Sequence, residues 1–271
     1  MNTNPVVIIY IHGTLPPRTM LKIPLIKRFF RCPPGITKIN DLGDSHIKDA
    51  FSTLCNNHAD RYPIDHCYTF GWIGSLNHAS RKNAAYELYK CLHDLKKKYL
   101  QESLSPLFHL ITHSHGGNVA LCLKKIADEY DNPADLSIEE LILLACPVQK
   151  ETVEYAASSL FKQVYSIHSH NDILQIIDPQ GIHAFLETLK VLGLEFTLSN
   201  FKRLGPLFSE RHFPFGSGIK QLKVRYPHRE LFHIEFLLPT FMESLPSLIT
   251  KMKEQLDAEV DEFVHIFDHT K

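Results

Sequence analysis

Short apolar runs alternate with longer amphipathic stretches along most of the chain. Residues Val6–Ile11 form an almost continuous apolar run, as expected of a strand buried on both faces. Similar short runs predict five more strands, at 67–72, 107–112, 140–145, 163–168 and 219–225. Helical periodicity predicts helices at about 81–99, 117–130, 151–161 and from 229 towards 267, the last one kinked or divided at Pro239 and Pro246. This alternation predicts an α/β fold, with a mainly parallel sheet of about six strands flanked by helices.

Two segments interrupt this rhythm. Residues 15–38 carry basic and apolar side chains but no acidic one, and residues 181–218 are rich in Phe and Leu. The chain shows no internal repeat and no flexible linker. We therefore expect a single domain over residues 1–271, with these two segments as insertions.

Composition excludes several classes of protein. Hydrophobic residues make up 44% and charged residues 22% of the 271 residues, which is typical of a folded globular chain. The 29 basic and 30 acidic residues give a net charge of -1, so no general attraction to nucleic acid is expected. No apolar stretch approaches the roughly 18 residues of a membrane helix.

The cysteine and histidine patterns bear on location and cofactors. The six cysteines form no CxxC pair and several lie on apolar helix positions, which favours free thiols. No basic segment precedes Val6–Ile11, so we expect a cytoplasmic protein, or one exported without an N-terminal signal peptide. The 17 histidines form no HExxH motif, and we expect neither a metal nor another cofactor.

Ser114 is the first candidate for chemistry. It lies in the sequence Thr112-His113-Ser114-His115-Gly116-Gly117, between a predicted strand and a predicted helix. A serine on such a turn projects its hydroxyl from the edge of the sheet, and the helix N-terminus supplies N–H groups. We therefore expect Ser114 to be a nucleophile, although Thr112 stands where a glycine is usual.

A nucleophilic serine needs hydrogen-bond donors for the oxyanion, and a base. His12-Gly13-Thr14 directly follows the first strand, so the backbone N–H of Thr14 is expected to converge with that of His115. The side chain of Arg81 is expected to cap or pair locally, and Trp72 to pack at the end of the second strand.

The acid and the base are expected after later strands. Asp172 follows the fifth strand, with Asp178 as the alternative. His228 follows the sixth strand, with His233 as the alternative; on a helix, five residues correspond to a rotation of about 500°, so both are not expected to face one serine. We favour His228 because loops after strands carry catalytic groups in this layout.

These motifs resemble those of the α/β-hydrolase superfamily, in particular its lipase- and esterase-like serine hydrolases. The resemblance covers most of the chain, through His12-Gly13-Thr14, Phe70-Gly71-Trp72-Ile73-Gly74 with Arg81, His113 to Asn118, Asn171-Asp172 and His228. It implies a compact member without the superfamily's first two strands, whose remaining six follow the order 4-3-5-6-7-8. It also implies a catalytic triad of Ser114, Asp172 and His228 that cleaves carboxylic esters through an acyl-enzyme, without a cofactor.

The substrate is predicted only as a class. The basic and apolar residues 15–38 fit weak contact with a lipid surface, or a solvated loop whose apolar side chains pack on the domain. Residues 181–218 occupy the usual position of a cap or lid, and fit an acyl pocket or ordinary core helices. We expect a small-molecule or lipid ester as substrate. The alternatives are a thioester or amide cleaved by the same triad, and a non-catalytic binding protein with this fold.

Overall fold

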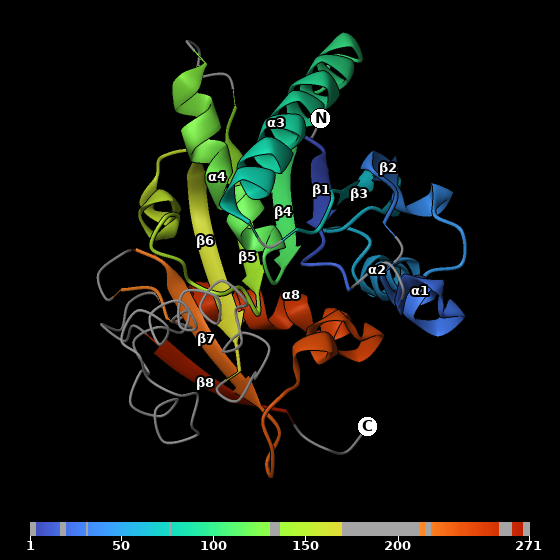
Figure 1. Ribbon diagram of the computed structural model, residues 1–271, viewed down its shortest axis with the longest axis vertical. Helices are drawn as coiled ribbons and strands as arrows, with labels where there is room; N and C mark the ends of the chain where they lie inside the picture. The colour runs from blue at the N-terminus through green and yellow to red at the C-terminus, as the bar shows by residue number, and fades with distance from the viewer. Residues whose placement is uncertain are drawn as a thin grey trace, which may run out of the picture.

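The computed structural model describes residues 4–16, 20–30, 32–75, 77–130, 136–169, 212–214, 218–254 and 262–267. Its centre is an eight-stranded sheet with the spatial order β2-β3-β1-β4-β5-β6-β7-β8 (Figure 1). All neighbouring strands are parallel except β2 and β3. The strands are β1 (Val6–Ile11), β2 (Gly35–Lys38), β3 (Cys67–Gly71), β4 (Leu107–His113), β5 (Ile138–Leu144), β6 (Phe161–His168), β7 (Lys220–Arg225) and β8 (Glu262–Ile266).

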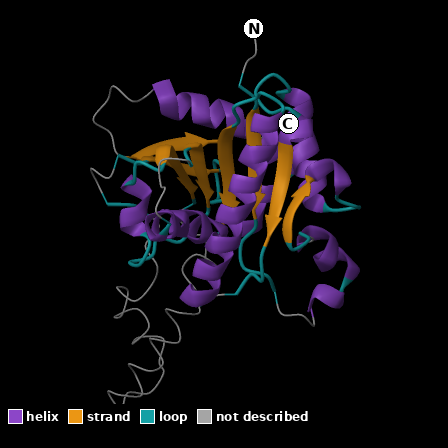
Figure 2. Cartoon of the chain, turned by 90° about the horizontal axis from the view of Figure 1, so that it is seen from above, coloured by secondary structure: helices purple, strands orange, loops and turns teal. Residues whose placement is uncertain are grey.

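Helices cover both faces of the sheet, which appears between them in Figure 2. The α-helices of the described residues are α1 (Pro24–Phe30), α2 (His46–Asn57), α3 (His78–Gln101), α4 (Gly116–Glu129) and α8 (Pro239–Glu254). The 3-10 helices are η1 (Met20–Lys22), η2 (Ile39–Asp41), η3 (Ile64–His66), η5 (Val153–Ala157) and η7 (His233–Leu237). None of these helices has the length and apolar character needed to span a bilayer.

The apolar core consists of two clusters, one on each face of the sheet. Val7, Ile9 and Ile11 of β1 belong to the cluster that includes α3 and α4. Ile8 and Tyr10 belong to the other cluster, which includes α2 and α8. Successive strand residues point to opposite faces, so burial of both faces explains the unbroken apolar run of β1.

The six predicted strands are present, and their spatial order, β3-β1-β4-β5-β6-β7, is the one that the resemblance implies. The prediction of about six strands is nevertheless too low, because β2 and β8 add one strand at each edge. β2 lies within the basic segment 15–38 and pairs antiparallel with β3. It forms the outer edge of the sheet beside β3, where the sequence predicts no strand.

Two helix predictions are wrong in part. Residues 151–161 contain only the short η5, because Phe161 already begins β6. The C-terminal segment is divided into η7 and α8, and its last part forms the strand β8. Pro239 starts α8, where its missing N–H is tolerated, while Pro246 lies inside that helix. The sequence pattern does not predict the helix α2. Most of 181–218 lies outside the described residues.

Candidate active site

The turn at Ser114 joins β4 to α4 with a strained backbone. Ser114 has φ of 53°, in the left-handed region that non-glycine residues rarely adopt. Its N–H donates to the carbonyl of Leu144 at 2.9 Å, and its carbonyl accepts from the N–H of Gly117 at 3.0 Å. Such a residue costs about 1–3 kcal/mol and persists only where its surroundings enforce it. A strand-to-helix turn with this conformation has the backbone geometry of a nucleophile elbow, and Ser114 itself is buried.

Glycines bring three pieces of backbone together around this turn. A Cβ on Gly13 would lie 2.6 Å from the Cβ of Ser114, so the chain after β1 passes directly against the serine. A Cβ on Gly116 would lie 2.4 Å from the carbonyl oxygen of Ile11, and one on Gly117 2.4 Å from the Sγ of Cys146. These positions leave no room for a side chain, which is why glycine is required there.

Thr112 fits its position in spite of replacing the usual glycine. Its side chain is buried, and its Oγ1 donates to the carbonyl of Ile142 on β5 at 3.1 Å. The hydroxyl is therefore satisfied by the neighbouring strand and does not enter the turn.

His12 holds the end of β1 against the end of β3. Its Nδ1 lies 2.7 Å from the carbonyl oxygen of Gly13, and its Nε2 accepts from the backbone N–H of Trp72 at 3.0 Å. The indole Nε1 of Trp72 in turn donates to the carbonyl of His12 at 2.7 Å. These bonds assign the proton to Nδ1 of a neutral imidazole, and burial lowers the pKa of His12 to about 4. The prediction that Trp72 packs at the end of its strand is confirmed.

Thr14 therefore follows a fixed segment, immediately beyond the glycine that touches Ser114. Its side-chain Oγ1 is buried and has no hydrogen-bond partner among the described residues. The neighbouring Leu15 N–H donates to the carbonyl of Gly74 at 3.2 Å, which ties this segment to the loop after β3. Gly13 lies against Ser114, and the role of the Thr14 N–H as an oxyanion donor stays a prediction.

The contact of Arg81 is long-range, whereas the sequence predicted a local cap or pair. The side chain is fully buried on α3, and its Nη1 lies 3.3 Å from Nδ1 of His115. A guanidinium can only donate, so this nitrogen of His115 accepts. The contact fixes the residue that follows the serine. The sequence offered one signal for it, a basic residue inside an otherwise apolar helix face.

The candidate acids cannot be placed. Asp172 and Asp178 lie outside the described residues. β6 ends at His168, at the same edge of the sheet as Ser114, and Ser169 follows it. The hydroxyl of Ser169 donates to Oε2 of Glu230 at 3.0 Å, which joins the end of β6 to the segment after β7.

The two candidate bases occupy different surroundings. His228 is exposed near the tip of a tight turn, which is closed by a bond from Tyr226 N–H to the carbonyl of Arg229 at 2.8 Å. The ring of His233 lies 4.5 Å, centroid to centroid, from that of His113, the residue before Ser114. His233, the alternative, is thus the histidine that the structure brings next to the turn.

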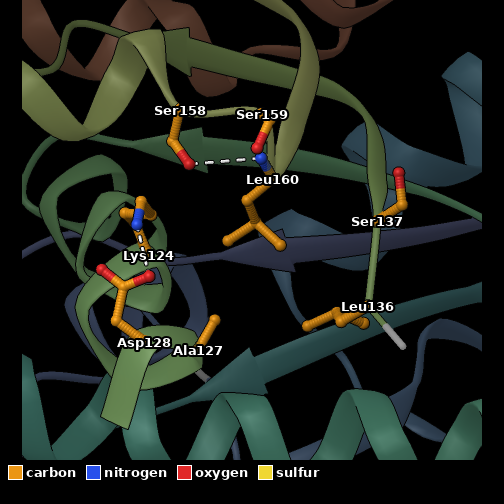
Figure 3. A pocket seen from close by; sticks show the side chains of 8 residues that line it. All are labelled: Lys124, Ala127, Asp128, Leu136, Ser137, Ser158, Ser159 and Leu160. Carbon is orange, nitrogen blue, oxygen red and sulfur yellow. Dashed lines mark hydrogen bonds and ion pairs between the residues drawn. The ribbon is translucent and has the colours of Figure 1, made fainter. Parts of the chain in front are cut away.

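Cavities and metal ligands add little at this edge. The pocket in Figure 3 has a volume of about 340 Å³ and lies between the second half of α4 and the starts of β5 and β6, away from Ser114. A second cavity of about 530 Å³ lies between β3 and α3, with Trp72 in its wall. Among the described residues, no three His, Cys, Asp or Glu side chains are grouped to bind a metal ion.

No protein-family model matches the chain, and no curated protein matches it significantly in sequence. The geometry around Ser114 therefore carries the functional argument.

Proposed function

We propose that the chain is a serine hydrolase with the α/β-hydrolase fold, and that it cleaves carboxylic esters with Ser114 as nucleophile. The observation that carries the proposal is the left-handed backbone of Ser114 at the β4–α4 turn, with Gly13 packed against its Cβ. The order of the six predicted strands supports the fold assignment. Non-glycine residues held in this conformation by their surroundings cluster at active sites, which supports the role proposed for Ser114.

In the proposed mechanism His233 is the base, in place of His228. His233 takes the proton of the Ser114 hydroxyl while Oγ attacks the acyl carbonyl, and the backbone N–H groups of Thr14 and His115 stabilise the oxyanion. The proton then passes to the leaving alcohol as the ester bond breaks. A water molecule, deprotonated by the same histidine, hydrolyses the acyl-enzyme. Asp172, or Asp178, orients the base.

The substrate class rests on the chemistry of the nucleophile more than on the basic segment. Arg28 of α1 is paired with Asp44 at 2.7 Å and Asp49 at 2.6 Å, and the ring of Phe29 stacks on His46 at 4.3 Å. These contacts use two of the side chains that lipid binding by residues 15–38 would need. We therefore propose an acyl ester, of a small molecule or a lipid, and leave surface contact out of the proposal.

Labelling with a fluorophosphonate probe tests the nucleophile and the base together. We expect the wild type to react, Ser114→Ala to lose labelling completely, and His233→Ala to slow it by at least about 1,000-fold, because an unassisted serine hydroxyl is a poor nucleophile. His228→Ala serves as the matched histidine control and should react at the wild-type rate.

Other outcomes distinguish the alternatives. Loss of labelling in His228→Ala instead of His233→Ala would restore the assignment made from the sequence. A folded wild type that stays unlabelled, with and without detergent, would favour a non-catalytic binding protein. If Ser114 is labelled, the turnover rates on matched ester, thioester and amide substrates would show which of the three reactions is preferred.

A further inference from the structure

His113 makes a contact that the proposed mechanism does not yet use. Its imidazole is buried beside the nucleophile, and its Nε2 lies 2.9 Å from the backbone carbonyl oxygen of His233. A carbonyl oxygen can only accept, so Nε2 carries the proton and donates. The imidazole ring of His113 also contacts the ring of His233. The residue before the serine is thus bonded to the residue proposed as its base.

We propose that His113 is a positioning residue, which holds the backbone of His233 so that its imidazole is presented to Ser114. The inference rests on the proposed function. His113 itself is not proposed to touch the substrate or to transfer a proton.

The rest of the segment after β7 shows why this bond matters. The segment, orange in Figure 1, connects β7 to α8. Around His233 the segment is closed on itself: Arg229 forms a bidentate pair with Glu235, at 2.7 and 2.6 Å, and Glu235 also accepts from the N–H of Phe232 at 2.6 Å. Beyond Glu235, the carbonyl of Leu237 lies 3.0 Å from Nε2 of His46. The bond from His113 is made within the closed part of the segment, at the residue whose side chain has to be aimed.

The charge state of His113 suits this role. Burial lowers its pKa well below the ordinary value, and positive charge on His233 or His12 lowers it further. His113 therefore stays neutral when His233 takes up the serine proton. A neutral donor can hold the base without repelling the imidazolium that forms in the reaction.

The test compares variants that keep or remove the donor. His113→Gln retains an N–H that can reach the carbonyl, whereas His113→Phe keeps a ring but no donor, and His113→Leu has neither. We expect Phe and Leu to lower the fluorophosphonate labelling rate and kcat by about 10- to 100-fold, with KM nearly unchanged, because a misplacement of about 1 Å costs a factor of this size. We expect Gln to remain within about threefold of the wild type.

A double-mutant cycle separates positioning from a general structural effect. On the His233→Ala background, His113→Leu should produce no further loss of labelling rate, because the residue that it positions is already absent. Thermal unfolding of each variant gives the folded fraction to which rates are normalised, and either donor-free variant suffices if the other does not fold. Equal losses in Gln and Leu, or an unchanged rate in both donor-free variants, would overturn the inference. A wild type that does not label at Ser114 would instead refute the proposed function, and the inference with it.

Discussion

The backbone of Ser114 is strained, and the residue is buried at the turn between β4 and α4. The left-handed conformation is enforced from three sides, by the bond to Leu144, by the bond from Gly117 and by the contact with Gly13. The two hydrogen bonds involve only its backbone, and a Cβ on Gly13 would lie closer to its Cβ, at 2.6 Å, than to its Oγ, at 3.3 Å. The strain is therefore a property of the position, and it should persist when the hydroxyl is removed.

This view predicts that Ser114→Gly is more stable than Ser114→Ala. Glycine adopts positive φ without a steric cost, a gain that its greater freedom in the unfolded chain partly offsets, so we expect a difference of about 1 kcal/mol in the free energy of unfolding. Urea denaturation of the two inactive variants measures it directly.

Ser103 provides a matched control. It is an exposed serine with φ of 60° beyond the end of α3, and it precedes β4, whereas Ser114 follows that strand. Ser103→Gly should also gain stability, and its fluorophosphonate labelling should equal that of the wild type. If only the Ser103 variant is stabilised, the strain assigned to Ser114 is absent.

At the scale of elements, continuous burial made the inner strands predictable. β1 reads Val-Val-Ile-Ile-Tyr-Ile and is buried on both faces, and β5 ends in the buried apolar run Leu-Ile-Leu-Leu. The edge strand β2 is only half-buried and reads Gly-Ile-Thr-Lys, which carries no periodic signal. The sequence predicts the end of a helix at β8. The segment forms a strand instead because it pairs with the open edge of β7, a contact that its own residues do not reveal.

One buried carboxylate links the sheet to the helical layer that contains α2 and α8. Glu140 on β5 lies 3.2 Å from Nδ1 of His109 on β4 and 3.3 Å from Arg61, which follows α2, and it accepts from Lys253 on α8. Burial alone would raise the pKa of Glu140, but the neighbouring His109, Lys253 and Arg61 outweigh it and lower that pKa to about 2. The cluster lies near the amino ends of the strands, opposite Ser114.

We expect Glu140→Gln to destabilise the protein at pH 7 by about 3 kcal/mol, because it removes the buried charge that pairs with the partly exposed Arg61 and Lys253 and with the buried His109. A carboxyl with a lowered pKa stabilises the fold above its unfolded value near 4.5, and that contribution disappears as the pH falls through about 2. The difference between variant and wild type should therefore shrink between pH 4.5 and 2, measured by urea denaturation.

The adjacent Glu139 is the control for this prediction. It pairs with Lys162 at 2.8 Å on the surface, where such pairs contribute less than about 1 kcal/mol. Glu139→Gln should therefore change stability little at either pH. An equal effect of the two substitutions would contradict a special role for the Glu140 cluster.

Across the whole molecule, the amino ends and the carboxyl ends of the strands differ in charge. Glu140 and its cations lie towards the amino ends of the strands, whereas His12 and His113, both buried and neutral, lie at the carboxyl ends beside Ser114. The sequence predicts that Ser114 lies between a strand and a helix and that Gly13 follows the first strand, and the structure has both, because each directly follows a recognisable strand. The sequence favours His228, whereas the structure brings His233 next to His113, because this placement depends on tertiary packing.

The buried neutral histidines predict how the whole fold responds to acid. A histidine whose pKa is lowered on folding stabilises the protein above its unfolded value near 6.5, and the contribution is lost as the pH falls towards the folded value, about 4 for His12. His12 alone should cost roughly 2 kcal/mol between pH 6.5 and 5, and His113 acts in the same direction. Trp72, the only tryptophan, contacts His12, so its fluorescence reports unfolding at this edge. Urea denaturation should show a clear loss of stability over that interval, a shallower one in His12→Gln, and a wild-type slope in His228→Gln, whose imidazole is exposed. A wild type equally stable at pH 6.5 and 5 would mean that these imidazoles are not held neutral, and the assigned proton on Nδ1 of His12 would have to be abandoned.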